Sequence, residues 1–143
     1  SEYINEETFC FTYGDGVSDV NLNKLIDFHY KQGLKATVTA VQPAGRFGSL
    51  EIDKEKVLSF NEKPEGDGSW VSGGFFVLEH SVLDLINSDR CVWEKEPLQL
   101  LAETSQLAVY KHHGFWQPMD TLRDKNFLEN LWETENAPWK VWN

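Results

Sequence analysis

The stretch Thr8-Phe-Cys-Phe-Thr-Tyr-Gly-Asp-Gly-Val-Ser18 decides the fold that this sequence predicts. From Thr8 to Tyr13 almost every residue is β-branched or aromatic on both sides of the alternation, which is typical of a strand buried on both faces in a parallel sheet. Gly14-Asp15-Gly16 ends this strand abruptly, and ligands of open α/β sheets bind just beyond the carboxyl ends of strands. Asp15 is therefore a candidate site residue, although Gly-Asp-Gly is equally compatible with a plain surface turn.

The composition fits one domain with a substantial core, because 41% of the 143 residues are hydrophobic and they include six Trp and nine Phe. A net charge of -10 argues against a nucleic-acid-binding protein, which needs a basic face, but a bound divalent cation would still permit nucleotide substrates. Cys10 and Cys91 form no CxxC pair, and Cys10 is expected to be buried in the first strand. These features predict a reduced, cytoplasmic protein without membrane association.

The order of the predicted elements indicates an α/β fold with a Rossmann-like, mixed and mostly parallel sheet, flanking helices and a small β-hairpin region. Asn21 is placed to cap a helix and Gly33 to end it. Strands are expected over 35–42, 70–78 and 107–112, a hairpin over 49–62, and helices over 81–87, over 97–104 and from 121 onward.

Two carboxylates, Asp15 and Asp120, are expected at neighbouring strand ends. Such a pair can share a Mg²⁺ ion, which retains water ligands and takes other oxygens from phosphates. Lys63, directly after Glu62 at the end of a third strand, can supply positive charge to a phosphate. Each residue also has an ordinary explanation, as a helix-start carboxylate, a solvated lysine or its ion-pair neighbour. His112 and His113 are expected on opposite faces of a strand, which argues against a shared metal.

Five motifs are spread over nearly all 143 residues. In chain order they are Tyr13-Gly-Asp-Gly16, Arg46-Phe-Gly48, Phe60-Asn-Glu-Lys-Pro64, Gly73-Gly-Phe-Phe-Val77 and Gly114-Phe-Trp-Gln-Pro-Met-Asp-Thr121. Together they resemble the motifs of the sugar-phosphate nucleotidyltransferases. Four further stretches resemble the cytidylyl-transferring branch of that family: Thr39-Ala-Val-Gln-Pro43, Gly45-Arg-Phe-Gly48, Gly66-Asp-Gly-Ser-Trp70 and Gln117-Pro-Met-Asp-Thr-Leu-Arg-Asp-Lys125.

The resemblance implies a Mg²⁺-dependent reaction of CTP with α-D-glucose 1-phosphate, giving CDP-glucose and pyrophosphate for dideoxysugar and surface-polysaccharide synthesis. By the same resemblance Asp15 and Asp120 would hold Mg²⁺, and Lys63 would contact the sugar phosphate. Glu62 would accept hydrogen bonds from sugar hydroxyls. Three further residues would line the sugar: Tyr13, Ser72, which stands where members commonly carry Asn, and Gly74, which would let the sugar approach the backbone.

The motifs begin after the family's N-terminal strand and Gly-rich nucleotide-binding loop. Residues 1–143 are therefore expected to be the C-terminal part of a single nucleotidyltransferase domain, inactive alone, whose full-length parent is a homo-oligomer. Two alternatives remain open. The chain could bind a sugar phosphate and Mg²⁺ without catalysis, or it could serve structurally, with Trp139 and Trp142 making subunit contacts.

Overall fold

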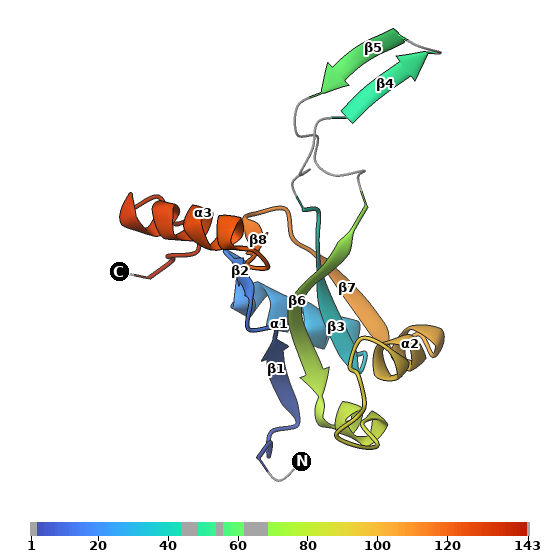
Figure 1. The fold of residues 1–143 in the computed structure, drawn as a ribbon. Helices are drawn as coiled ribbons and strands as arrows, with labels where there is room; N and C mark the ends of the chain where they lie inside the picture. The colour runs from blue at the N-terminus through green and yellow to red at the C-terminus, as the bar shows by residue number, and fades with distance from the viewer. Residues whose placement is uncertain (1–2, 44–48, 54–55, 62–68, 143) are drawn as a thin grey trace.

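A four-stranded mixed sheet lies at the centre of the computed structural model, which describes residues 3–43, 49–53, 56–61 and 69–142 (Figure 1). The strands lie side by side in the order β1 (Thr8–Thr12), β6 (Val71–Glu79), β3 (Ala36–Val41) and β7 (Leu107–Lys111). The predicted α/β class, a mixed sheet with flanking helices, is confirmed. Pairing between β3 and β7 is parallel, whereas β6 runs antiparallel to both β1 and β3. Parallel pairing is thus the minority among the ladders described in this sheet.

Helical elements cover both faces of this sheet, because successive side chains of a strand point to opposite faces. Helix α1 (Leu22–Gln32) contacts β3, β6 and β7, and its His29 bonds to Thr37 on one face. Helix α2 (Glu96–Glu103) and the 3-10 helix η1 (His80–Leu85) pack on the face that carries Ala36. The helix predicted over 81–87 is therefore this 3-10 helix.

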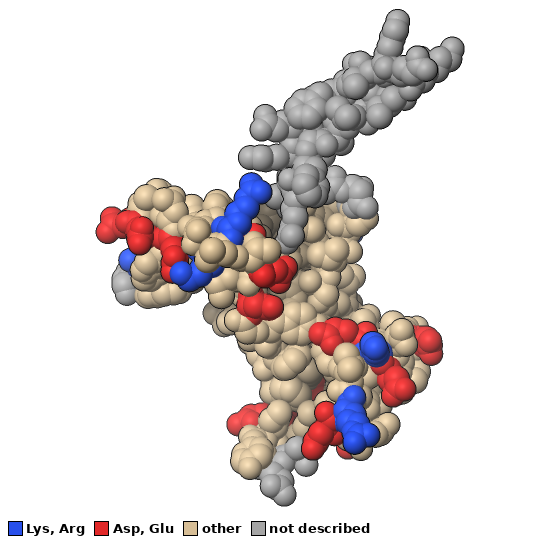
Figure 2. All heavy atoms as spheres, viewed as in Figure 1, with Lys and Arg blue, Asp and Glu red and all other residues tan. Residues whose placement is uncertain are grey.

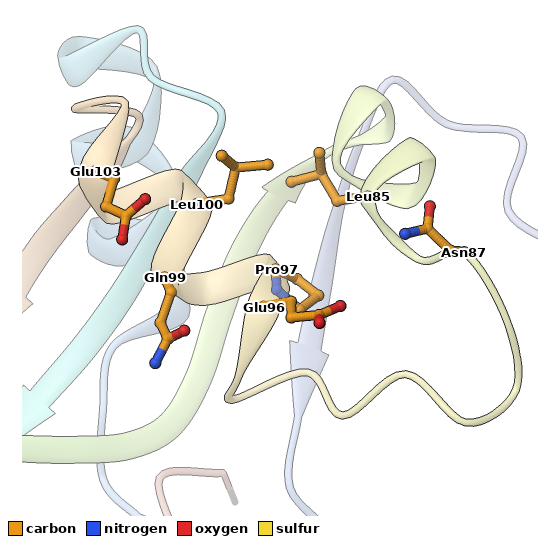
Figure 3. Close-up of a pocket in the computed structure, with 7 residues that line it drawn as sticks. All are labelled: Leu85, Asn87, Glu96, Pro97, Gln99, Leu100 and Glu103. Carbon is orange, nitrogen blue, oxygen red and sulfur yellow. The ribbon is translucent and has the colours of Figure 1, made fainter.

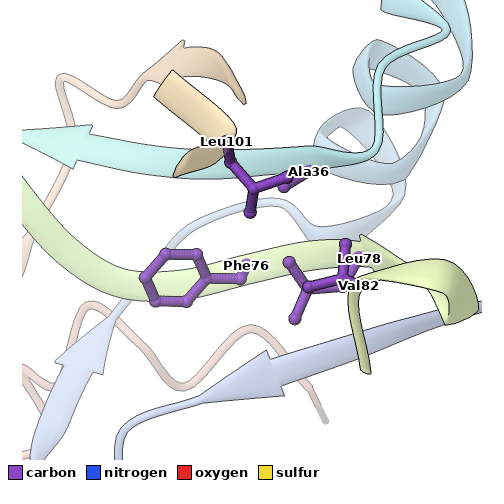
Figure 4. Close-up of a cluster of buried hydrophobic side chains, with 5 residues drawn as sticks. All are labelled: Ala36, Phe76, Leu78, Val82 and Leu101. Atoms are coloured by element: carbon purple, nitrogen blue, oxygen red, sulfur yellow. The ribbon is translucent and has the colours of Figure 1, made fainter. Parts of the chain in front are cut away.

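A hydrophobic cluster between β3, β6, η1 and α2 forms the main core (Figure 4). All of its members are at most 3% exposed: Ala36, Phe76, Leu78, Val82 and Leu101. Aromatic rings extend the cluster, since Phe76 lies 5.7 Å from both the Tyr13 and the Trp93 ring by centroid distance. Through these ring contacts the hydrophobic core extends to Tyr13, which directly follows the first strand and precedes the candidate site.

The helix ends follow the signals in the sequence. The Asn21 side chain accepts a hydrogen bond from the Lys24 amide at 3.0 Å, and Gly33 ends α1 in the left-handed region with φ +62°. Helix α3 (Leu122–Glu133) begins, as expected, after residue 121, with a capping box between Thr121 and Asp124. These caps fix the chain on either side of the candidate site.

The expectation that the first strand is buried on both faces is wrong within the described structure. β1 is an edge strand with β6 as its one described partner, and Cys10 to Thr12 are exposed. The β-branched and aromatic residues correctly predicted a strand. They did not predict its position in the sheet, because such residues suit edge strands as well. The exposed Cys10 therefore gives no support to the predicted cellular compartment.

Two smaller two-stranded units complete the fold. The predicted hairpin is confirmed as β4 (Ser49–Asp53) paired with β5 (Lys56–Asn61). The other unit pairs β2 (Gly16–Ser18) with β8 (Trp116–Pro118), and neither strand is among the elements predicted above. We call this second unit the β2–β8 ribbon.

The C-terminal segment folds back on its own chain. Trp139 packs on Phe115 with ring centroids 5.4 Å apart, and the Lys140 ammonium lies 5.7 Å from the centre of the Trp132 ring. Leu128 of α3 is buried, whereas Trp132 is 50% exposed because α3 lies beside the ribbon and not on the central sheet (Figure 1). Among the helices described, none has the length and apolar character needed to cross a membrane.

Candidate active site

The β2–β8 ribbon brings together the two carboxylates singled out in the sequence. Gly16 pairs with Pro118, and one position further the Asp15 carbonyl accepts a hydrogen bond from the Met119 amide at 2.8 Å. Asp120 is the next residue, so Asp15 and Asp120 lie at the same end of the ribbon although 105 positions separate them. Both side chains are exposed to solvent. The backbones of these two residues are therefore brought side by side by a ribbon and not by two parallel strand ends.

The start of α3 holds the backbone beside Asp120. The Thr121 amide donates to Asp124 Oδ2 at 3.0 Å, and the Asp124 amide donates to Thr121 Oγ1 at 3.2 Å. The Gln117 side chain on β8 donates to Asp124 Oδ1 at 3.2 Å and joins the same cap to the ribbon. Asp120 thus lies between two fixed elements, and its carboxylate precedes a helix N-terminus.

The carboxylate pair fits a divalent cation of the magnesium type. Across the described ranges no group of three or more His, Cys, Asp or Glu side chains is arranged to hold a metal. In a magnesium site here, Asp15 and Asp120 would supply two oxygen ligands, and water and phosphate oxygens would supply the others. That division suits Mg²⁺, which keeps several waters and is usually bound through one or two carboxylates.

Tyr13 and Gly74 pack closely beside this pair. The Tyr13 amide donates to the Gly74 carbonyl at 2.9 Å, and the Ser72 hydroxyl accepts from the Gly74 amide at 3.3 Å. Gly74 has φ +77°, and a Cβ there would lie 2.5 Å from Tyr13 Cδ2. Glycine is required on both counts. In this structure the Tyr13 ring fills the space that the missing side chain leaves.

A groove of about 700 Å³ opens beside Asp15. The Tyr13 hydroxyl next to it is buried and hydrogen-bonds to no atom among the described residues. Burial, together with the neighbouring Glu94 carboxylate, raises the pKa of Tyr13 to about 12. The groove is lined by Phe11, Thr12, Tyr13, Gly14, Asp15 and Glu94. Sequence analysis missed Glu94, because nothing in the local pattern before α2 indicates that it faces Tyr13 across the fold.

Glu62 and Lys63, the predicted sugar and phosphate contacts, lie outside the described residues. The described part of β5 ends at Asn61, directly before them. The structure therefore brings together Asp15, Asp120, Tyr13, Ser72 and Gly74 around the strand ends, while the roles of Glu62 and Lys63 stay predictions.

A second cavity, of about 320 Å³, lies between η1 and α2 (Figure 3). It is lined by Leu85, Asn87, Glu96, Pro97, Gln99, Leu100 and Glu103. Its charged lining residues are both carboxylates, which disfavours phosphate binding. The space-filling view shows acidic and basic side chains interspersed over α2 and α3 (Figure 2). No basic patch of the kind that binds nucleic acid appears on the described surface of that face.

Residues 1–125 match the family model described as nucleotidyl transferase, and the chain belongs to that family.

Among curated relatives, the chain is 57% identical over 143 residues to glucose-1-phosphate cytidylyltransferase from Salmonella typhi, covering 99% of this chain and 56% of the relative. It is 33% identical over 120 residues to a mannose-1-phosphate guanyltransferase from Debaryomyces hansenii, covering 80% of this chain and 33% of that protein. The chain thus spans little more than half the length of the first of these relatives.

Solved structures agree with the fold. A Bacillus anthracis protein in complex with sucrose, provisionally assigned as a glucose-1-phosphate thymidylyltransferase, superposes with a TM-score of 0.62 at 16% identity. That match covers 99% of this chain and 58% of the other. HddC from Yersinia pseudotuberculosis gives a TM-score of 0.60 at 19% identity, over 88% of this chain and 56% of HddC. At these identities the likeness establishes the fold alone.

Proposed function

We propose that this chain is the sugar-phosphate and metal-binding half of a Mg²⁺-dependent cytidylyltransferase. Its reaction would join CTP and α-D-glucose 1-phosphate to give CDP-glucose and pyrophosphate, in the synthesis of dideoxysugars for surface polysaccharide. The observation that carries the proposal is the exposed pair Asp15 and Asp120 at one end of the β2–β8 ribbon. The specificity is supported by 57% identity to the Salmonella typhi enzyme of that name.

The chemistry of this reaction suits the residue types. A phosphate oxygen of glucose 1-phosphate would form a bond to the α-phosphorus of CTP, while the bond from that phosphorus to pyrophosphate breaks and its electron pair leaves with pyrophosphate. The attacking oxygen is already anionic near neutral pH, so no general base is needed. When bound, Mg²⁺ would neutralise phosphate charge. The chain's own residues would chiefly orient the two substrates and balance their charge.

Asp15 and Asp120 would hold the cation, and Lys63 would pair with the sugar phosphate. Loss of one such contact to developing charge costs roughly 3–4 kcal/mol in comparable sites. Glu62 would accept hydrogen bonds from sugar hydroxyls. The sugar would lie beside three residues of the groove and its rim: Tyr13, Ser72 and Gly74.

The domain organisation, the location and the oligomeric state of the parent protein belong to the same proposal. Residues 1–143 would form the C-terminal part of one nucleotidyltransferase domain, and the family's N-terminal loop would supply the contacts to CTP. The parent would be a cytoplasmic homo-oligomer.

A substrate panel on the full-length protein tests the proposal. Pyrophosphate release would be measured with CTP or dTTP against glucose 1-phosphate or mannose 1-phosphate, with and without Mg²⁺. We expect turnover with CTP and glucose 1-phosphate only when Mg²⁺ is present. Preference for another nucleotide or sugar would refute the specificity. Calorimetric binding of glucose 1-phosphate without product on addition of CTP would favour a non-catalytic binding module.

A further inference from the structure

His112 links the central sheet to the β2–β8 ribbon. Its backbone amide donates to the Ala40 carbonyl on β3 at 2.9 Å, which fixes the residue to the sheet. Its ring Nε2 lies 2.9 Å from Asp19 Oδ1 and 3.3 Å from the Phe115 carbonyl oxygen. Both neighbours are acceptors, so Nε2 carries a hydrogen and donates it. One side chain thus binds both strands of the ribbon at their far end.

The two strands converge at the point that His112 contacts. The Ser18 hydroxyl donates to the Phe115 carbonyl at 2.7 Å, and the Asp19 amide donates to the same oxygen at 3.2 Å. Asp19 follows β2 and Phe115 precedes β8, so this junction closes one end of the ribbon. Asp15 and Asp120 lie at the other end. Because each strand has only three residues, a shift at the junction would be transmitted to the carboxylates.

The close approach of His112 to Asp19 depends on Gly114. A Cβ at Gly114 would overlap Asp19 Oδ1 and lie 2.7 Å from His112 Cε1. The His112 side chain is 11% exposed and that of Asp19 is 30% exposed. A pair shielded to this extent is weakened less by solvent and salt than a surface pair. The junction is therefore a fixed contact of the fold.

We propose that His112 is a positioning residue for the Asp15–Asp120 pair, an inference that rests on the proposed function. The Trp116 indole also ties the ribbon to the central sheet, because it donates to the Gly73 carbonyl at 2.9 Å. The bond from His112 to Asp19 supplies the second contact, and two contacts hold both carboxylates toward one cation.

Substitutions of His112 in the full-length protein test this inference, with Mn²⁺ as the probe. His112→Leu removes the donor, whereas His112→Gln keeps an N–H group at similar reach. His113→Leu is the matched control, because His113 is exposed and packs edge-on against Trp70. Free Mn²⁺ would be titrated by electron paramagnetic resonance, and circular dichroism would confirm folding. Pyrophosphate release against Mg²⁺ concentration would be measured in parallel.

We expect His112→Leu to raise the Kd for Mn²⁺ roughly tenfold, the lower end of the range for residues that orient metal ligands. The Mg²⁺ concentration for half-maximal activity would rise with it. For His112→Gln and His113→Leu the Kd for Mn²⁺ would stay within about twofold of the parent value. His112→Gln keeps an N–H donor for Asp19, and His113 does not take part in that hydrogen bond. Asp19→Ala would reproduce His112→Leu, and combining the two would add little.

Two results would overturn the inference. His112→Leu could lower the melting temperature while leaving the Mn²⁺ Kd at the parent value, which would make its role purely structural. His112→Gln could be as impaired as His112→Leu, which would exclude the N–H donor as the feature that matters. A parent that binds Mn²⁺ through Asp15 and Asp120 but forms no CDP-glucose would refute the proposed function and still leave the inference supported by the Mn²⁺ data.

Discussion

The central sheet and the β2–β8 ribbon are held in place by different interactions. In the sheet, β3 is almost wholly buried and β6 is buried through its middle. A chain of polar side chains crosses them: His29 donates from Nε2 to Glu79 Oε1 at 2.9 Å, its Nδ1 lies 2.9 Å from Thr37 Oγ1, and the Thr8 hydroxyl donates to Glu79. Every residue of the ribbon strands is only partly buried. The ribbon depends on a few directed hydrogen bonds. The buried core and the proposed site therefore lie in different parts of the chain, and we expect substitutions to change folding stability and activity separately.

Truncating the core should give the largest effect on folding. Phe76 is 1% exposed and packs against three aromatic rings. We expect Phe76→Ala to lower the free energy of unfolding by about 3–5 kcal/mol in urea denaturation of the full-length protein. Phe127→Ala on α3, where the side chain is 46% exposed, should change it by about 0.5 kcal/mol or less. Equal losses for both variants would contradict the distinction between the two regions.

Neutralising a ribbon carboxylate should affect catalysis and spare the fold. We expect Asp15→Asn and Asp120→Asn each to lower kcat by roughly 100-fold or more, by analogy with loss of one charge-stabilising group. Folding stability should change by only about 0.5 kcal/mol because both side chains are exposed. Asp27→Asn, at an exposed position of α1, is the matched control and should leave kcat unchanged. Steady-state kinetics would show the contrast, and an active Asp120→Asn variant would count against the site.

Gly74 lies where the sheet meets the site, and its substitution should have an intermediate effect. Gly74→Ala places a side chain at φ +77° and against the Tyr13 ring. We expect a loss of about 1–3 kcal/mol in unfolding free energy. Gly14→Ala is the control, because a Cβ there meets nothing within 4 Å; its effect should be below about 1 kcal/mol. Denaturant midpoints compare the two variants. An unchanged midpoint for Gly74→Ala would show that a side chain at position 74 can be accommodated beside the Tyr13 ring.

The smallest expected effect concerns Tyr13. Its pKa is raised to about 12 by burial first and by Glu94 second. A raised pKa means that the folded state retains the proton more strongly. The resulting stabilisation is present below about pH 10, the ordinary tyrosine value, and is lost as pH rises toward 12. Absorbance titration should reveal one late-ionising tyrosine, absent in Tyr13→Phe. Ionisation of every tyrosine near pH 10 in the folded protein would refute this.

Most of the fold could be predicted from the sequence because its signals are local. Asn21, Gly33 and the Thr121–Asp124 pair mark helix ends through their own backbone contacts. The position of β1 at the sheet edge could not be predicted, because strand composition does not report neighbours distant in sequence. The ribbon was missed for a related reason: three-residue strands are too short to show periodicity.

Asp15 and Asp120 were singled out from the sequence as metal ligands, and that role stays a prediction; how their backbones come to lie side by side is seen only in the structure. Asp15 stands out beside two glycines, and Asp120 stands before a helix start. Their proximity depends on a ladder between segments about 100 residues apart, which no local pattern encodes. The approach of Glu94 to Tyr13 and the contact between His112 and Asp19 likewise join residues far apart in the sequence. The sequence offered no signal for either.

The central claim, that Asp15 and Asp120 share one cation, is tested most directly by calorimetric titration of Mn²⁺ into the full-length protein and its Asp15→Asn and Asp120→Asn variants. The account predicts that the parent binds an ion at this site and that each variant alone loses the same ion. If either variant still bound that ion with the parent's affinity, the two carboxylates would not form one site.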